Sequence, residues 1–104
     1  MRSYRVLFAE DADRQLLAIW RYIAETSDLD VADRVVADIR ERCLALNAFP
    51  NRGTPRDDLR VGLRTVPMPR KATIGFTVTG EAVVIVAIAY RGQDLARLVG
   101  TAID

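Results

Sequence analysis

The stretch that decides the fold is Ala82-Val83-Val84-Ile85-Val86-Ala87-Ile88-Ala89-Tyr90, followed directly by Arg91-Gly92-Gln93-Asp94. From Ala82 to Ile88 it carries no charged side chain and no hydroxyl group. A strand that is apolar at odd and even positions alike is typical of the middle of a sheet, with helices covering at least one face. The stretch therefore predicts a central strand that ends where polar residues begin.

Two further strands are predicted just before this one. Leu63 to Met68 is rich in branched residues, and Pro67 within it favours an edge or the end of a strand. Ala72 to Val78 alternates between apolar and polar residues, as a half-buried strand does. Thr79 to Glu81 contains a glycine and predicts a tight turn into the central strand.

The first half of the chain changes from a strand pattern to a helix pattern. Tyr4 to Phe8 predicts a short strand. From Glu10 onward, apolar residues recur at steps of three and four: Ala12, Leu16, Ile19, Trp20 and Ile23. After a short break, Asp30 is the predicted N-cap of a second helix. The inner face of that helix is expected to hold Ala32, Val35, Val36, Ile39, Cys43 and Leu46.

The order of these elements predicts an α+β fold in a single domain spanning residues 1–104. An N-terminal strand and an antiparallel helical hairpin come first, because the break between the two helices is short. A three-stranded antiparallel meander then completes one sheet, on which the hairpin packs. Asp94 is placed to cap a short C-terminal helix carrying Leu95, Leu98 and Val99. Trp20 and Cys43 lie on the apolar helix stripes, so we expect both to be packing residues.

Composition narrows the possible functions. The net charge is only +1, which argues against a field that holds nucleic acid indiscriminately and against sequence-specific DNA binding by this chain. No apolar run approaches the roughly 20 residues of a membrane span, and the N-terminal apolar run is too short for a signal peptide. A single cysteine suits a reducing compartment, so we expect a cytoplasmic protein. With one cysteine and no histidine, neither a metal site nor a cofactor is predicted.

Several short motifs, in this order and spacing, resemble the RelE/ParE superfamily of type II toxins, and look most like ParE. They cover almost the whole chain: Trp20-Arg21-Tyr22-Ile23-Ala24, Leu46-x-x-Phe49-Pro50-x-x-Gly53, Gly62-Leu63-Arg64 and Tyr90-Arg91-Gly92-Gln93-Asp94-Leu95. The resemblance implies a toxin that inhibits DNA gyrase and blocks replication. It also implies a small ParD-like antitoxin that neutralises the toxin by laying its C-terminal segment over it.

The same superfamily contains ribosome-dependent ribonucleases of the RelE type, which is the alternative function. Cutting RNA through the 2′-hydroxyl needs a base, an acid for the leaving oxygen and cations around the phosphate. The chain has no histidine and one lysine, Lys71, and no tyrosine or histidine follows Arg91. We therefore expect binding without catalysis. A third possibility is a non-toxic interaction module of the same fold.

The candidate site residues follow from these expectations. The basic residues between 60 and 71, together with the end of the last strand, are expected to bind the target: Arg64, Arg70, Lys71, Tyr90, Arg91, Gln93 and Asp94. Apolar residues expected to anchor the antitoxin are Leu16, Trp20, Leu63 and Val66. A plainer interpretation remains open for Arg91-Gly92, namely a strand exit with a solvated arginine.

Overall fold

A five-stranded sheet forms the middle of the chain's computed structural model, which describes residues 3–103, with side chains through residue 100. The elements are β1 (Arg5–Phe8), α1 (Glu10–Thr26), α2 (Leu29–Leu44), a 3₁₀ turn (Ala45–Asn47), β2 (Thr54–Pro55), β3 (Arg64–Met68), β4 (Ala72–Thr79), β5 (Ala82–Tyr90) and α3 (Leu95–Ile103). The strands lie in the order β1-β5-β4-β3-β2. β1 runs parallel to β5, and the other neighbouring pairs are antiparallel.

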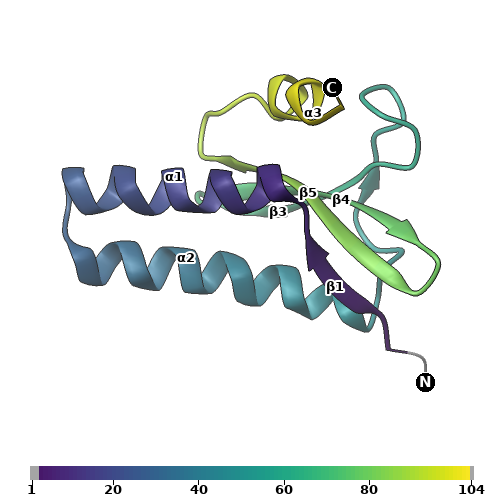
Figure 1. Ribbon diagram of the computed structural model, residues 1–104, viewed down its shortest axis with the longest axis horizontal. Coiled ribbons are helices and arrows are strands. Elements are labelled where there is room, and N and C mark those ends of the chain that lie inside the picture. Colours follow the sequence, from purple (N-terminus) through teal and green to yellow (C-terminus); the bar gives the residue numbers. More distant parts are fainter. Residues whose placement is uncertain (1–2, 104) are drawn as a thin grey trace.

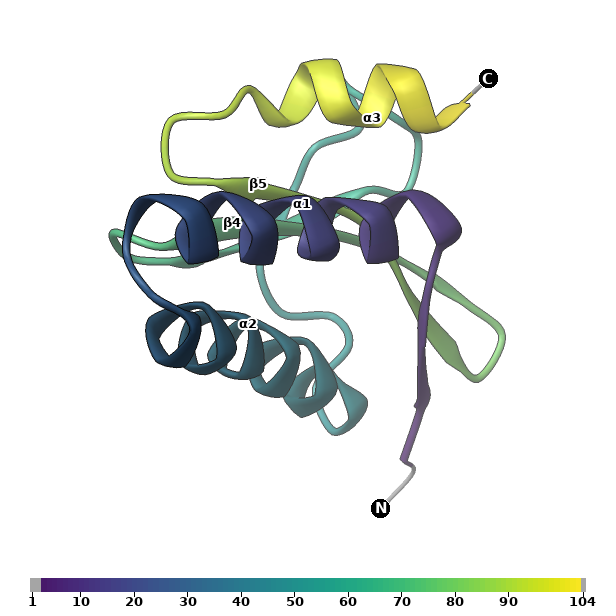
Figure 2. The same ribbon diagram turned by 60° about the vertical axis from the view of Figure 1, so that its left-hand side comes forward.

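Helices cover both faces of this sheet. α1 and α2 lie side by side as a hairpin (Figure 1), and α3 and α2 lie on opposite sides of β4 and β5 (Figure 2). We call the two sides of the sheet the hairpin face and the α3 face. The predicted α+β fold is confirmed, with its N-terminal strand, helical hairpin, antiparallel meander and short C-terminal helix. No helix in the described part of the chain is long and apolar enough to cross a membrane.

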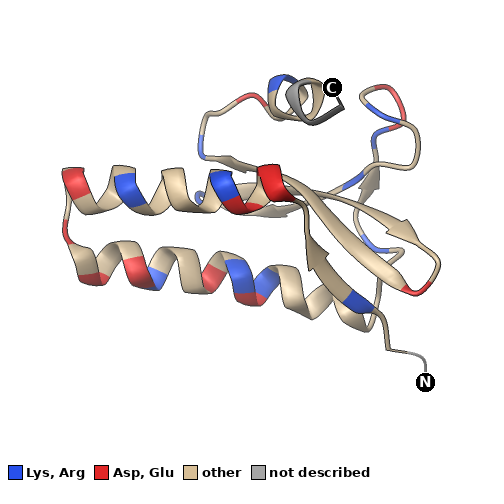
Figure 3. Ribbon diagram, viewed as in Figure 1, with Lys and Arg blue, Asp and Glu red and all other residues tan. Residues whose placement is uncertain are grey.

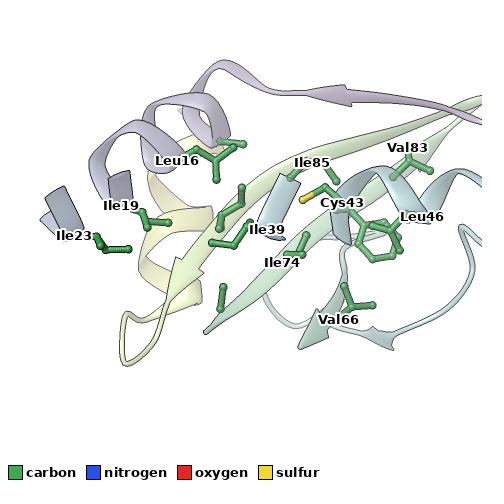
Figure 4. Packing of buried hydrophobic residues seen from close by; sticks show 14 of the residues in the cluster. Leu16, Ile19, Ile23, Ile39, Cys43, Leu46, Val66, Ile74, Val83 and Ile85 are labelled. Carbon is green, nitrogen blue, oxygen red and sulfur yellow. The ribbon is translucent and has the colours of Figure 1, made fainter. Parts of the chain in front are cut away.

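The main core lies between the helical hairpin and the sheet (Figure 4). Its buried side chains come from both helices, the 3₁₀ turn and the sheet, and include Leu16, Ile19, Ile23, Ile39, Cys43, Leu46, Ile74, Phe76, Val83 and Ile85. A smaller core on the α3 face contains Leu63, Val86, Ala87, Ala89, Leu95 and Val99. The central strand β5 therefore contributes side chains to two cores, which explains why it is apolar at every position before Tyr90.

A β-bulge in β5 changes the face to which its later residues point. Ala87 pairs with Gly75 and Ile85 pairs with Phe76, so Val86 has no partner on β4. Val86 and Ala87 consequently both belong to the core on the α3 face, and Ile88 returns to the hairpin face. Bulges of this kind re-aim the side chains beyond them. Because of this extra residue, Tyr90 packs against the core on the hairpin face.

The structure corrects the sequence-based predictions at two local points. The N-cap of α2 is Asp28, whose side chain accepts a hydrogen bond from the Val31 amide at 2.8 Å, so the prediction of Asp30 was wrong. The polar sequence from Asn51 to Val61, with Gly53 and Pro55, predicts a loop, but this segment contains β2, a two-residue strand that pairs with the start of β3. Strands this short leave no periodic pattern, because alternation needs at least four residues to be visible.

The predictions for Trp20 and Cys43 agree with the structure. Trp20 is partly buried against the main core, and its indole N–H donates to the Asp33 carboxylate at 2.7 Å. Cys43 is fully buried, and this burial raises the pKa of its thiol from 9.0 to about 12, partly opposed by the charge of Arg40. A thiol so rarely ionised is chemically inert, so its role is packing.

Gly53 and Gly62 provide a test of how tightly the loop before β3 is packed. Both have left-handed backbones, with φ of 89° and 83°, but a Cβ on Gly53 would lie 2.5 Å from the Thr65 carbonyl oxygen, whereas one on Gly62 meets nothing within 4 Å. We expect Gly62→Ala to lower the free energy of unfolding by about 1–2 kcal/mol through backbone strain alone. Gly53→Ala should lower the free energy of unfolding by about 1–3 kcal/mol more than Gly62→Ala does, because the loop or β3 must move to make room for the Cβ. Urea unfolding of both variants measures this difference, and equal losses would contradict the packing described for Gly53.

Candidate functional site

The polar residues after β5 and those in the turn between β3 and β4 meet at one end of the sheet. The Arg91 amide donates a hydrogen bond to the Lys71 carbonyl oxygen at 2.8 Å, which joins the two segments. Ala72 is the pairing partner of Tyr90, so the strands that carry these segments end together. We call the group of Arg70, Lys71, Tyr90, Arg91 and Gln93 the strand-end site.

One side of the strand-end site is a hollow between α1 and the exit of β5, with a volume of about 470 Å³. It is lined from α1 by Gln15, Ala18, Ile19 and Tyr22, and from the strand exit by Tyr90 to Gln93. The rings of Tyr22 and Tyr90 meet edge to face, with centroids 6.4 Å apart and planes at 63°. This geometry is favourable for aromatic pairs and gives the hollow an aromatic wall.

Two glutamine side chains satisfy backbone groups at the edge of β5. β1 ends at Phe8, so it does not reach the last residues of β5. In its place, Gln15 Oε1 accepts from the Ile88 amide at 2.7 Å and Gln93 Oε1 accepts from the Tyr90 amide at 2.8 Å. The backbone N–H of Gln93 also donates to the Tyr90 carbonyl oxygen at 3.1 Å. An unpaired amide at a sheet edge is costly when water is excluded, so these glutamines fix the strand exit.

The other side of the strand-end site is a second hollow of about 490 Å³, lined by residues 67–73 and Arg91. Three cations belong to this lining: Arg70, Lys71 and Arg91. The Lys71 ammonium pairs with the Asp38 carboxylate of α2 at 2.9 Å. The Arg91 guanidinium lies 5.4 Å from the centroid of the Tyr90 ring, within range of a cation–π interaction. Arg91 borders both hollows.

Of the seven residues expected to bind the target, five form the strand-end site. Arg64 lies apart from them, because it begins β3 while Met68 ends it, about 13 Å away at roughly 3.3 Å per residue. Its guanidinium instead donates to the Gly53 carbonyl oxygen at 3.4 Å. Asp94 accepts from the Ala96 amide at 3.0 Å and so caps α3, as the sequence predicted. Its contribution to the site is to hold the segment after Gln93.

Three of the four residues expected to anchor an antitoxin lack the surface to do so. Leu16, Leu63 and Val66 are 2%, 0% and 4% exposed, because all three are packed into the chain's own cores. Trp20 is partly buried, and its indole N–H is already bonded to Asp33. A helix stripe recurring at steps of three and four is the pattern of a core-facing surface. Leu16, Leu63 and Val66 are therefore core residues in this structure, and the expectation that they are exposed anchors for an antitoxin was wrong.

Sequence reasoning missed two residues that line the hollow beside Tyr90, and it missed the exposed apolar residues of the helical hairpin. Gln15 and Tyr22 line the hollow beside Tyr90, and neither lies on the apolar stripe of α1. Leu17 and Tyr22 of α1 are 52% and 57% exposed, and Leu29, at the start of α2, is 59% exposed. The sequence did contain a signal for Leu17 and Tyr22, because both are large apolar residues that lie outside the apolar stripe of an amphipathic helix. Charged residues otherwise occur along much of α1 and α2 (Figure 3).

Comparisons with known proteins agree on one family. Residues 6–95 match the family described as ParE toxin of type II toxin-antitoxin system, parDE. Toxin ParE3 of Caulobacter vibrioides is 31% identical over 96 residues, which are 92% of this chain and 95% of that protein. A chain of the chromosomal ParDE TA system from P. aeruginosa has the same fold, with a TM-score of 0.75 and 24% identity, covering 86% of this chain and 97% of that one.

Gln93 gives a direct test of how the strand exit is held. Replacing Gln93 by Ala removes the acceptor for the Tyr90 amide, so we expect the amide hydrogen of Tyr90 to exchange about tenfold faster, the equivalent of about 1.4 kcal/mol. Gln93→Glu keeps an oxygen at the same position and should leave the exchange rate nearly unchanged. Hydrogen exchange followed by NMR measures both, with the Ile88 amide, held by Gln15, as the internal reference. Unaltered Tyr90 exchange in Gln93→Ala would show that this hydrogen bond does not hold the exit.

Proposed function

Because this chain belongs to the family of ParE toxins of type II toxin-antitoxin systems, we propose that it inhibits DNA gyrase and is neutralised by a ParD-like antitoxin. The observation that carries the proposal is the match over residues 6–95, which includes the strand-end site up to Gln93. A poisoned gyrase stalls replication, so the outcome in the cell is growth arrest. Such a target also places the toxin in the cytoplasm.

The arrangement of the strand-end site supports binding without covalent chemistry. It offers guanidinium groups and an aromatic ring, which suit non-covalent recognition. Two nearby carboxylates are engaged, since Asp38 pairs with Lys71 and Asp94 caps α3, while Glu41 lines a third hollow beside Lys71 on the α2 side. Glu81 directly precedes the nine-residue strand β5 and Tyr90 ends it, so the two lie roughly 30 Å apart at about 3.3 Å per residue. A general base and a general acid that act on the same phosphodiester must both lie within hydrogen-bond reach of it, so Glu81 and Tyr90 are too far apart to form such a pair.

The RelE-type ribonuclease remains the alternative function, since the fold is shared by both activities. What favours it is the presence of Lys71, Arg91 and Tyr90 at one end of the sheet. What argues against it is the chain's lack of histidine, together with the ion pair that occupies Lys71. The third possibility, a non-toxic interaction module, would keep the fold and lose growth arrest.

The antitoxin contact is proposed to use the exposed apolar residues of the helical hairpin. Leu17, Tyr22 and Leu29 are each more than half exposed although they are large and apolar. A helix or strand of the antitoxin that covered them would gain up to about 1.5–3 kcal/mol for each side chain fully buried. Tyr22 also lines the hollow beside Tyr90 and Arg91, so an antitoxin segment bound there would cover part of the strand-end site. Neutralisation would then follow from simple occlusion.

A gyrase assay tests the proposed function. The purified chain should inhibit supercoiling and cause cleaved DNA to accumulate, and prior addition of the antitoxin should prevent both effects. We expect Arg91→Ala to weaken inhibition at least about tenfold, because a charge-assisted contact contributes about 1.5–3 kcal/mol. Arg34→Ala, an exposed arginine of α2, is the matched control and should inhibit like the parent chain.

Two results would reject this function. Cleavage of ribosome-bound mRNA together with no effect on gyrase would establish the ribonuclease alternative. Normal growth of cells that express the chain alone at high level would indicate the non-toxic module. Inhibition unaltered by Arg91→Ala would remove that arginine from the target-binding site.

A further inference from the structure

Two arginines at the strand-end site adopt a backbone conformation that arginine normally avoids. Among the described residues, Arg70 and Arg91 are the only ones other than glycine with positive φ, at 68° and 51°. The left-handed region brings Cβ too close to the following carbonyl oxygen, so it is unfavourable for any residue with a side chain. At the other described positions with positive φ, the residues are Gly53, Gly62 and Gly80. Strained residues of this kind cluster at binding sites, which directs attention to what the two side chains do.

The two arginines lie beside the same hollow. The bond from the Arg91 amide to the Lys71 carbonyl oxygen fixes the segment after β5 against the turn that holds Arg70. Arg70 and Arg91 both line the hollow of about 490 Å³, whose lining contains no aspartate or glutamate. The left-handed turns therefore bring two arginines to one concave surface.

The charges of these two arginines are available to an external anion. Within the described residues, the Arg70 side chain forms neither a hydrogen bond nor an ion pair. The Arg91 guanidinium contacts the Tyr90 ring, which leaves its charge uncompensated. Lys71 differs from both, because its ammonium pairs with Asp38. The anion would therefore be bound by the two arginines. Lys71 would contribute less, because its charge is already paired with the Asp38 carboxylate.

We propose that Arg70 and Arg91 bind the phosphodiester backbone of duplex DNA without reading its base sequence. A guanidinium group offers a planar pair of donors that matches phosphate oxygens, so two arginines at one hollow can pair with the anionic backbone of a nucleic acid. The choice of DNA over RNA rests on the proposed function, since gyrase acts on DNA.

This contact is local and is consistent with a chain whose net charge is +1. Two neutralised phosphates predict that the logarithm of the binding constant falls with the logarithm of salt concentration with a slope of about −1.8. Binding of the free chain is therefore expected to be weak and to decrease only moderately as the salt concentration rises. When the toxin is bound to a gyrase–DNA complex, the same contact would add to the protein–protein interface.

Fluorescence anisotropy with a labelled mixed-sequence DNA duplex, in the absence of gyrase, tests the proposal. The full chain is titrated at several KCl concentrations. The double variant Arg70→Gln with Arg91→Gln removes both charges and should bind at least about tenfold more weakly, with a slope near zero. The control is Arg21→Gln with Arg34→Gln, which removes two exposed charges from α1 and α2 and should retain the slope.

A second variant separates the binding role from folding. Arg70→Gly with Arg91→Gly removes the charges and also relieves the left-handed strain, so it should lose DNA binding while its Tm stays equal or rises. A lower Tm would overturn the argument that the two arginines are kept at a cost to stability. Together with lost DNA binding, an unchanged or higher Tm supports the proposal.

The remaining outcomes identify other ligands or reject the site. Tighter binding of a single-stranded RNA of equal length would overturn the choice of DNA, and stronger competition by polyglutamate than by unlabelled duplex would indicate an acidic protein partner instead. Equal losses in the Arg21/Arg34 control would show that general charge, and not this site, binds DNA. Because gyrase is absent, failure here leaves gyrase inhibition standing, whereas failure of the gyrase assay alone leaves DNA binding standing.

Discussion

Burial of β5 on both faces is the constraint on which the rest of the structure depends. The helical hairpin covers one face and α3 covers the other, so Val83 to Ala89 must be apolar whichever way they point. A strand under this constraint has no room for a catalytic side chain along most of its length, because an unpaired polar group there would be costly. Polar chemistry is therefore confined to the end of the strand, from Tyr90 onward.

The extra residue in β5 determines which side chains lie at the end of the strand and on which face of the sheet they lie. Because Val86 lacks a partner on β4, Tyr90 lies on the hairpin face beside Tyr22, while the preceding Ala89 remains on the α3 face. Gln15 and Gln93 then satisfy the edge amides that β1 does not reach. The result is a fixed strand exit with an aromatic hollow on one side and a cationic hollow on the other. Such a surface is suited to recognition through shape and charge, as the proposed toxin mechanism requires.

Much of the fold could be predicted from the sequence, because periodicity reports burial directly. The stripe of α1, the alternation of β4 and the continuous apolar run of β5 each predicted the correct element. The bulge at Val86 could not be predicted, since one unpaired residue in an all-apolar strand leaves no mark on the pattern. For the site, proximity in sequence grouped Arg64 with Arg70, yet the length of β3 separates them. Leu16, Leu63 and Val66 were misassigned because the same apolar pattern describes a core residue and an exposed anchor; only packing distinguishes the two.

The central claim is that the strand-end site acts by holding its target and transfers no proton. The Tyr90 hydroxyl forms no hydrogen bond with any other described residue, while its ring contacts both Tyr22 and Arg91. The most direct measurement is growth arrest after induction of Tyr90→Phe and Tyr90→Ala at equal protein levels. Tyr90→Phe should arrest growth like the parent chain and Tyr90→Ala should be much weaker, because the ring is needed and the hydroxyl is not. Loss of arrest in Tyr90→Phe to the level of Tyr90→Ala would contradict the account and point to acid–base chemistry at this tyrosine.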